Sequence, residues 1–381
     1  MRRPGALFPV GRLAGPEDVV DRQEFIEDTV RELLSGQSIL VTGPRRIGKS
    51  SVALEILRRL KAQGCHGGRI DLFYVASVEE FASLLWQLVL EQRFGPSRAV
   101  IRTLKGIQER IRHIVLTQSI GDFDVEIQFP LHGEAPRPDE ALALALEYAD
   151  RWAARQGAPF VVLLDEFQEL ERLGGTPLIK KLRSIFQAQE RCTYLLLGSQ
   201  ESTLKTLFSD RRQAFYRFAS IKALPPVPGE AWLEYLRGKY ESVGIKTSTV
   251  ALEIMIRETG GHPFGMMQLA NAVYLRCLPR QKPAVSAELV LATLEEDVLA
   301  RLTPIYEKEW EDVRKVKQAP EVVQALLAER PPYGLGIPSG RVTEILSRLQ
   351  EQGVIARMDR GRYAFVEALF AKWLKRQLGM E

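Results

Sequence analysis

A glycine-rich run near residue 45 has the residue types and spacing that most clearly indicate chemistry. Residues 43–50, Gly-Pro-Arg-Arg-Ile-Gly-Lys-Ser, match the pattern G-x-x-x-x-G-K-[ST]. Glycines let such a loop close around an anion, so that backbone N–H groups and the dipole of a following helix face phosphate oxygens. The lysine adds a point charge, and the final hydroxyl can ligate Mg²⁺. The run therefore predicts a site for nucleotide phosphates.

The sequence on either side of this run supports the interpretation. Residues 38–43 (SILVTG) predict a short strand, and residues 50–64 predict a helix that ends at Gly64. A chance glycine-rich turn is the alternative, and it becomes rare once a strand must precede the run and a helix must follow it. The residues expected to contact the nucleotide are Gly43, Pro44, Arg45, Arg46, Ile47, Gly48, Lys49, Ser50 and Ser51.

An acidic pair at the end of a second apolar run completes the predicted site. Asp165 and Glu166 follow four buried-type residues, Val-Val-Leu-Leu. A phosphate-binding loop needs a carboxylate at the end of a neighbouring strand to hold Mg²⁺, so we expect Asp165 and the Ser50 hydroxyl to serve the metal. Glu166 would then polarise the attacking water as a general base. The alternative for Glu166 is a solvated acid at a strand end, and hydrolysis rather than nucleotide sensing depends on this residue.

Strand and helix patterns alternate through the first half of the chain. Residues 19–34 predict a first helix with Asp21 as its N-cap, and residues 69–77 predict a second strand. The apolar runs 160–166 and 192–199 are typical of strands at the centre of a sheet. The alternation favours an α/β fold with a parallel sheet flanked by helices.

Length and composition exclude several classes of protein. At 381 residues with 45% hydrophobic residues, the chain can form two or three domains with apolar cores. A formal net charge of +4 excludes a uniformly basic nucleic-acid binder. Three separated cysteines form no zinc or disulfide pattern and favour a reducing cytoplasm. Since no run of about 18 apolar residues and no secretory leader occurs, we expect a soluble cytoplasmic protein without a membrane partner.

The second half of the chain is predicted to be helical and to end in a small mixed unit. Three prolines between residues 225 and 228 break the alternating pattern, and residues 230–298 contain only helical signals. Two helix patterns and two short strand patterns follow between residues 321 and 366, an order that suggests a winged helix. The domains expected are an α/β core that carries the glycine-rich run over 1–225, a helical domain over 226–300 and a winged-helix-like domain over 301–381.

Five segments taken in order give the chain a family resemblance. They are GPRRIGKSS, LLDEFQEL, LLLGSQES, AFYRF and TGGHPFGMMQLA. The chain resembles the archaeal-type P-loop ATPases of the AAA+/STAND group, relatives of the origin-recognition initiators. The resemblance covers most of the chain, from PEDVVDRQEFIE to RYAFVEALFAKWL, although Glu367-Ala368 stands where the family usually has Asp-Pro. It implies a P-loop NTPase core, an all-α lid and a winged helix, with ATP and Mg²⁺ as cofactors.

The resemblance also assigns roles to polar residues outside the glycine-rich run. Ser199 or Gln200, at a strand end, takes the sensor-1 position near the γ-phosphate. Arg217 matches an arginine that acts as a finger toward a neighbouring subunit; a surface ion pair is its alternative, and Arg211 and Arg212 are rival candidates.

Two further contacts with the nucleotide follow from the resemblance. His262 and Pro263 lie in the lid turn that closes over the nucleotide, where a purely structural histidine is the alternative. Val20 and Arg22 would flank the adenine, with core packing as the alternative for the valine.

Basic segments raise the question of a partner. The candidates for nucleic-acid contact are the basic stretch 98–112 of a predicted amphipathic helix over 93–118, the run 205–222 and the winged helix with its closing helix, residues 341–376. A solvated helix face is the alternative for the first two, and protein docking for the third. Three readings of the function stay open: ATP hydrolysis coupled to oligomer assembly or to loading of a DNA or protein partner, a nucleotide-gated switch with little turnover, and a DNA-binding adaptor of a mobile-element or defence system.

Overall fold

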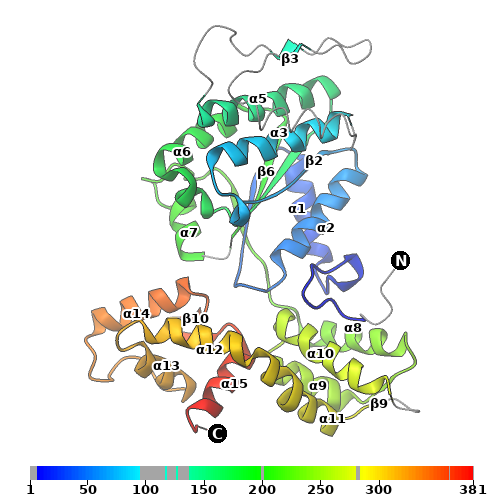
Figure 1. Cartoon of the computed structure of the whole chain (residues 1–381), viewed down its shortest axis with the longest axis vertical. Helices are drawn as coiled ribbons and strands as arrows, with labels where there is room; N and C mark the ends of the chain where they lie inside the picture. Colours follow the sequence, from blue (N-terminus) through cyan, green and yellow to red (C-terminus); the bar gives the residue numbers. More distant parts are fainter. Residues whose placement is uncertain are drawn as a thin grey trace.

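A five-stranded parallel sheet organises the first half of the chain (Figure 1). The computed structural model describes residues 7–94, 116–117, 126–127, 137–198, 201–279, 284–359 and 361–380. The strands, in spatial order, are β2 (His66–Asp71), β5 (Phe160–Asp165), β6 (Cys192–Gly198), β1 (Ile39–Thr42) and β7 (Ser220–Ala223). Each neighbouring pair is parallel, which confirms the predicted α/β fold.

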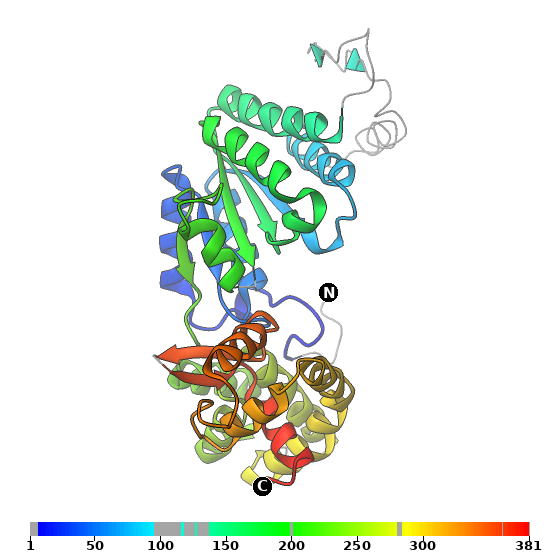
Figure 2. The ribbon, with the colours of Figure 1, turned by 90° about the vertical axis from the view of Figure 1, so that its left-hand side faces the viewer.

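Helices cover both faces of this sheet, and Figure 2 shows α1 and α5 on opposite sides of it. The flanking helices are α1 (Gln23–Leu34), α2 (Lys49–Ala62), α3 (Val78–Phe94), α5 (Pro138–Gln156), α6 (Glu169–Ala188) and α7 (Glu201–Ser209). In β5, Val161 and Leu163 pack toward α1 and α2, whereas Val162 and Leu164 pack toward α3, α5 and α6. Because side chains alternate along a strand, a strand covered on both faces must be apolar throughout.

The glycine-rich loop and the acidic pair lie at the carboxyl ends of strands in the centre of the sheet. The glycine-rich loop follows β1, the acidic pair ends β5, and β6 lies between these two strands. Gly48 is the N-cap of α2 and has a φ of 100°, a left-handed conformation that favours glycine at this turn. The sheet order therefore places the loop and the acidic pair at one edge.

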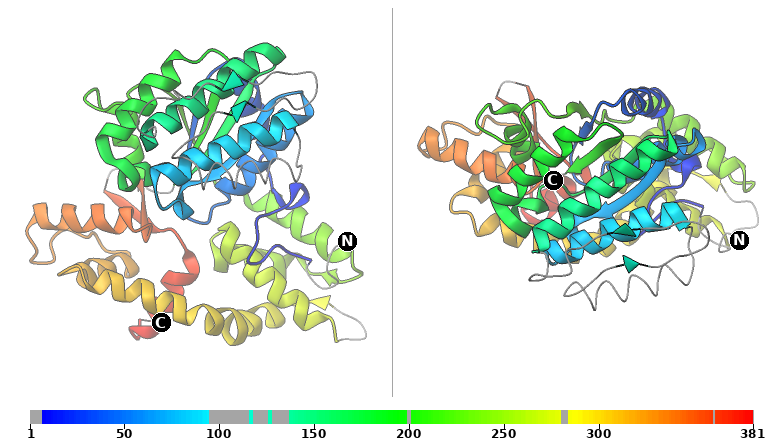
Figure 3. Two further views of the ribbon diagram at one scale, coloured as in Figure 1. Left: turned by 45° about the horizontal axis from the view of Figure 1, so that its top comes forward. Right: turned by 90° about the horizontal axis from the view of Figure 1, so that it is seen from above.

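The second half of the chain is mostly helical and lies beyond this edge of the sheet (Figure 3). Its helices are α8 (Gly229–Glu241), α9 (Thr249–Thr259), α10 (Pro263–Cys277), α11 (Ala287–Thr293), α12 (Ala300–Arg314), α13 (Ala319–Leu327), α14 (Ser339–Glu351) and α15 (Ala368–Gln377). A π-helical segment, Leu294–Leu299, joins α11 to α12. A single apolar cluster runs from Trp232 in α8 to Leu374 in α15, and the division into a lid and a third domain stays a prediction.

The predicted order of helix, helix and hairpin is present near the end of the chain. After α13 and α14, the strands β10 (Ile355–Asp359) and β11 (Arg362–Phe365) pair antiparallel. The last helix, α15, buries Leu369, Phe370, Trp373 and Leu374, the apolar face that its sequence predicts. The assignment as a winged helix stays a prediction.

Several predicted boundaries are wrong. The first helix begins at Gln23, and Asp21 is not its N-cap, because Asp21 has a φ of 49° and Arg22 takes the cap position. The strand predicted over 69–77 is β2, which begins at His66 and gives way to a 3₁₀ turn, Leu72–Tyr74.

Two further predictions are wrong or lie mostly outside the described residues. Residues 230–298 are not wholly helical, because β8 (Lys246–Thr247) pairs with β9 (Ala284–Val285). The predicted helix over 93–118 lies mostly outside the described residues, and its residues Leu116–Thr117 form β3, which pairs with β4 (Glu126–Ile127).

Two other features bear on the expected cellular setting. In the described ranges, no helix has both the length and the apolar content that crossing a bilayer requires. All three cysteines, Cys65, Cys192 and Cys277, are buried, and no disulfide joins them.

Candidate nucleotide-binding site

The glycine-rich loop presents the N-terminus of α2 to a cavity. Gly48 carries no side chain that could cap the first N–H groups of α2. Lys49 is only 7% exposed, and its Nζ donates hydrogen bonds to the carbonyl oxygens of Gly43 (2.8 Å) and Pro44 (2.7 Å). Uncapped helix N–H groups beside a buried ammonium form a positively polarised site, which suits a phosphate anion.

Asp165 is buried at the end of β5 and held on both carboxylate oxygens. Its Oδ1 accepts a hydrogen bond from the backbone N–H of Glu166 at 3.1 Å. Its Oδ2 accepts from Nη2 of Arg69 at 2.8 Å, and the same Nη2 donates to Asp71 at 2.6 Å. Arg69 and Asp71 belong to β2, which pairs directly with β5. Sequence reasoning missed this arginine, whose contact with Asp165 spans 96 residues.

Glu166 lies just beyond Asp165 in an uncommon backbone conformation. Its φ is 51°, a left-handed value that a non-glycine residue seldom adopts. The Oε2 of Glu166 accepts a hydrogen bond from Nε2 of Gln168 at 2.5 Å, while Oε1 of Gln168 is buried without a hydrogen-bond partner. Glu166 and Gln168 both line the cavity. Strained backbone at a strand end that faces a cavity is typical of functional sites.

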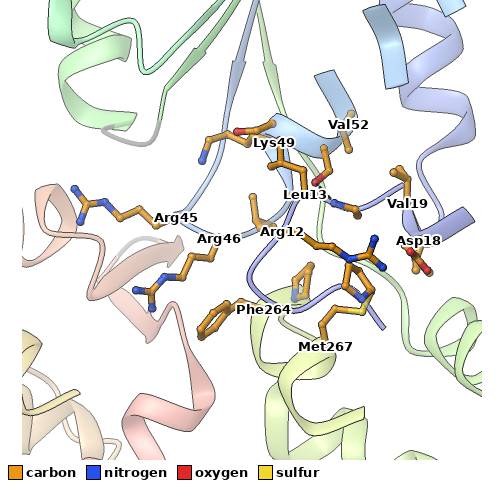
Figure 4. Close-up of a pocket in the computed structure, with 18 of the residues that line it drawn as sticks. Arg12, Leu13, Asp18, Val19, Arg45, Arg46, Lys49, Val52, Phe264 and Met267 are labelled. Atoms are coloured by element: carbon orange, nitrogen blue, oxygen red, sulfur yellow. Dashed lines mark hydrogen bonds between the residues drawn. The ribbon is translucent and has the colours of Figure 1, made fainter. Parts of the chain in front are cut away.

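The cavity has a volume of about 590 Å³ and lies between the sheet edge and α10 (Figure 4). This volume suits a small-molecule cofactor. Its lining combines residues of the glycine-rich loop with apolar residues that the sequence did not single out. The latter include Leu13, Val227, Trp232, Phe264 and Met267. The apolar lining is suited to a planar ring, whereas the loop end is suited to phosphates.

The lead-in segment, residues 7–22, forms one wall of the cavity. Phe8 is fully buried against the rings of Tyr235 and Tyr240, at centroid distances of 6.1 and 5.2 Å. The backbone N–H of Ala14 donates to Oγ of Ser51 at 3.0 Å. The lead-in is therefore anchored in α8 at one end and on α2 at the other, and Ser51 serves this anchor.

Asp18 provides a further anchor for the lead-in. Its Oδ1 accepts a hydrogen bond from the Tyr235 hydroxyl at 2.8 Å and pairs with the ammonium of Lys239. Burial raises the pKa of the Tyr235 phenol, and the Asp18 carboxylate raises it further. The phenol therefore stays a hydrogen-bond donor to Asp18.

Val20 and Arg22 both line the cavity, as the resemblance implies for residues near the adenine. Arg22 is 3% exposed and donates from Nη1 to the Pro226 carbonyl at 3.3 Å, while its Nη2 is buried without a hydrogen-bond partner. Burial lowers the pKa of Arg22, and the nearby Asp21 carboxylate partly offsets this. A buried, incompletely paired guanidinium in a cavity wall is suited to donate a hydrogen bond to an acceptor atom of a ligand.

His262 joins the helical region directly to the glycine-rich loop. Its ring Nε2 lies 3.2 Å from the carbonyl oxygen of Arg45, and its Nδ1 is buried without a partner. Burial lowers the pKa of His262; the Glu367 carboxylate raises it, while Arg46 and Lys49 lower it. Pro263, the next residue, begins α10 and lines the cavity. The structure therefore brings the predicted lid turn onto the loop.

The structure describes the finger candidate but not the sensor candidates. Ser199 and Gln200 lie outside the described residues, although β6 ends just before them. Arg217 is exposed, has a φ of 55° and places its guanidinium 5.1 Å above the Tyr216 ring. It is not among the residues that line the cavity. Of its rivals, Arg212 pairs with Asp210 at 2.8 Å.

The donor set at the loop fits Mg²⁺ held together with a nucleotide. Asp165 supplies a carboxylate and Ser50 a hydroxyl, both hard oxygen donors. Within the described ranges, no cluster of three Asp, Glu, His or Cys side chains is arranged to hold a metal by itself. Since Mg²⁺ is commonly bound by one or two carboxylates plus substrate phosphates, these residues match that mode of binding.

Comparison with known proteins agrees with this geometry. Residues 21–214, slightly more than half of the chain, match a family model described as an AAA ATPase domain. No curated protein sequence matches the chain. The Walker-type ATPase PABY2304 of Pyrococcus abyssi is 19% identical with a TM-score of 0.66, over 97% of this chain and 99% of that one. The ORC2 protein of Aeropyrum pernix is 14% identical with a TM-score of 0.58, over 98% of each chain.

Proposed function

Because the chain belongs to the AAA ATPase domain family, we propose that it binds Mg²⁺–ATP at residues 43–50 and hydrolyses it. The observation that carries the proposal is the uncapped N-terminus of α2 with a buried lysine, in a cavity that Glu166 also lines. The ORC2 protein, whose fold this chain shares, was solved as ADPNP–ADP complexes, which supports a nucleotide as the ligand.

Each loop residue has a distinct part in the proposed reaction. Backbone N–H groups of residues 43–51 hold the phosphates, and Lys49 exchanges its loop carbonyls for phosphate oxygens. Ser50 and Asp165 hold the Mg²⁺, which neutralises charge on the phosphates when bound. Glu166 orients the attacking water and accepts its proton, and Gln168 fixes the orientation of the Glu166 carboxylate.

The other contacts assign the remaining parts of the nucleotide. Val20 and Arg22 lie beside the base in this proposal, and Met267 packs against the base from the lid. His262 and Pro263 close the cavity over the phosphates. Ser199 or Gln200 contacts the γ-phosphate from the end of β6. The apolar part of the cavity lining supports placing the base there.

Three variants test the nucleotide site. Lys49→Ala removes the buried charge and should weaken binding of a fluorescent ATP analogue by at least about tenfold. Glu166→Gln should bind the analogue like wild type but lose about 100-fold or more in turnover. The matched control is Glu171→Gln, an exposed acid on α6. Unchanged binding in Lys49→Ala would refute the loop assignment, and normal turnover in Glu166→Gln would remove that residue from catalysis.

We further propose that turnover is coupled to assembly of identical subunits, with Arg217 reaching a neighbour's nucleotide. Arg217 supports this because it is exposed and lies outside its own cavity. Oligomer size measured in ATP and in ADP is the test. A protein that stays monomeric in both nucleotides would refute the assembly.

A nucleotide-gated switch is the second candidate, because the last part of the chain touches the glycine-rich loop. Nη1 of Arg46 lies 2.9 Å from Oε1 of Glu367. A slow rate that no partner stimulates, together with a nucleotide-dependent change of size, would favour the switch.

For the partner, we propose that a protein docks on α13, α14 and the β10–β11 hairpin. Non-specific binding of duplex DNA to these elements is the alternative. Arg341 and Arg348 on α14 both pair with Glu344, at 2.6 and 3.0 Å, which partly neutralises this helix. Charge neutralisation of this kind reduces attraction to phosphates. Measuring ATPase activity with and without duplex DNA distinguishes the two, since DNA stimulation that weakens steeply with salt would favour nucleic acid.

A further inference from the structure

Arg46 is a residue of the glycine-rich loop that lines the cavity, and its guanidinium reaches toward the helical region. Figure 4 shows it directed away from Lys49 and toward Phe264. Its guanidinium lies 4.6 Å above the Phe264 ring, and its Nη1 lies 2.9 Å from Oε1 of Glu367 and 3.6 Å from Oε1 of Glu309. A single loop side chain is thus in contact with α10, with α12 and with the residue that precedes α15.

The acceptor of this contact is itself held in place. The Glu367 side chain is 12% exposed, compared with 35% for Arg46. Its Oε2 accepts a hydrogen bond from the fully buried Tyr306 at 3.3 Å, so both carboxylate oxygens are engaged. Glu309 is the second acid, and burial together with the Glu367 charge raises its pKa. Glu367 is therefore the better oriented of the two acids.

The neighbouring residue Arg45 is held from the same side. The carbonyl oxygen of Arg45 lies 3.2 Å from Nε2 of His262. Gly353, between α14 and β10, lies so close that a Cβ there would be 3.4 Å from Cδ of Arg45. Arg46 has a φ of 61°, which non-glycine residues rarely adopt. Contacts from outside the sheet region thus surround the strained residue of the loop.

We propose that Glu367 is a positioning residue for the nucleotide site: by holding Arg46 it keeps the loop in the left-handed turn that aims its N–H groups at the phosphates. The inference rests on the proposed nucleotide function of the loop. It gives the last 15 residues of the chain control over how tightly a nucleotide is held. A strained conformation persists when its surroundings over-determine it, and Glu367 provides that constraint.

The test compares Glu367→Gln with two controls. Glu307→Gln removes an exposed acid from α12, and Tyr306→Phe removes the other hydrogen bond to Glu367 while leaving the Arg46 pair. Release of a fluorescent ADP and the KM and kcat for ATP are measured for each. We expect Glu367→Gln to speed release and raise KM by about five- to tenfold with kcat within about twofold. Glu307→Gln should stay within about twofold of wild type, and Tyr306→Phe, which keeps the Arg46 pair, should change release and KM by less than Glu367→Gln does.

A charge exchange shows whether the pair itself matters. Arg46→Glu and Glu367→Arg should each weaken nucleotide binding, and the double variant should recover at least about half of the loss on a logarithmic scale. Circular dichroism and the melting temperature establish that each variant is folded.

The outcomes separate this inference from the proposed function. Absence of nucleotide binding by wild type would overturn both. Wild-type binding with Glu367→Gln equal to Glu307→Gln would overturn only the positioning role. Equal effects of Glu367→Gln and Tyr306→Phe, or no recovery in the double variant, would also overturn it, because packing rather than the Arg46 pair would then be responsible.

Discussion

Replacing Phe8 by alanine tests whether the lead-in segment, which forms one wall of the cavity, contributes to nucleotide binding. Phe8 is fully buried among the rings of α8, and removing such a side chain from a packed core costs about 3–5 kcal/mol. The hydrogen bond from Ala14 to Ser51 also holds the segment in place, at a point between Phe8 and η1 (Pro16–Asp18). The loss should therefore fall mainly on docking of the lead-in rather than on the sheet.

The expected effect on nucleotide binding follows from this docking loss. A change of about 3 kcal/mol corresponds to a factor of about 100 in an equilibrium, and apparent affinity falls with the fraction of molecules whose site is complete. We expect the Kd of a fluorescent ATP analogue to rise about 10- to 100-fold. The size of the rise depends on how strongly the lead-in of wild type favours the docked state over the undocked state.

The assay pairs this titration with limited proteolysis. Arg12 is exposed in the lead-in, so trypsin should cleave there faster in Phe8→Ala. Leu275→Ala, a half-exposed leucine on α10, serves as the control and should change neither measurement. If cleavage at Arg12 accelerates while the Kd stays within about twofold of wild type, the lead-in does not help to bind the nucleotide and the reasoning fails.

Three further predictions follow from single contacts. Because burial lowers the pKa of His262 below the usual 6.5, the folded protein favours the neutral ring. The free energy of unfolding should therefore fall as pH drops below about 6.5. In His262→Gln, the free energy of unfolding should depend less on pH between about pH 7.5 and 5.5, as measured by unfolding curves. Gly67→Ala would place a Cβ 1.9 Å from a backbone carbonyl of β5 and should destabilise by about 3 kcal/mol or more in urea titrations, whereas Gly64→Ala, with open space around it, should cost about 1–2 kcal/mol. If the Gly64 variant proves the less stable, the steric argument is wrong. Mixing Arg217→Ala with Glu166→Gln subunits should restore ATPase activity if the arginine acts on a neighbour; a mixture as inactive as its components would place any role within one subunit.

The sequence was informative where chemistry depends on neighbours along the chain. The glycine spacing, the strand before it and the helix after it locate residues 43–50 between β1 and α2. The apolar run 160–164 likewise identified a central strand, because only a strand covered on both faces stays apolar at every position. The carboxylates that follow this strand were therefore located correctly at the sheet edge.

Contacts between distant residues were not predictable in this way. Arg69 meets Asp165 because β2 and β5 happen to be neighbours, and nothing in the local pattern RIDLFY indicates that pairing. The contact between Arg46 and Glu367 spans 321 residues. The burial of Phe8 depends on rings more than 220 residues away in the chain. Such pairings arise from tertiary packing and carry no periodic signal.

The three buried thiols lie in three different apolar clusters, so their reactivity can report the unfolding of each cluster. Cys65 lies in the apolar cluster beneath α1 and α2, Cys192 in the cluster on the opposite face of the sheet, and Cys277 in the cluster of the helical region. A thiol reagent modifies a buried cysteine only when its surroundings open. Modification rates at the three positions, followed by mass spectrometry across a denaturant series, therefore measure the opening of each core separately in the unaltered chain.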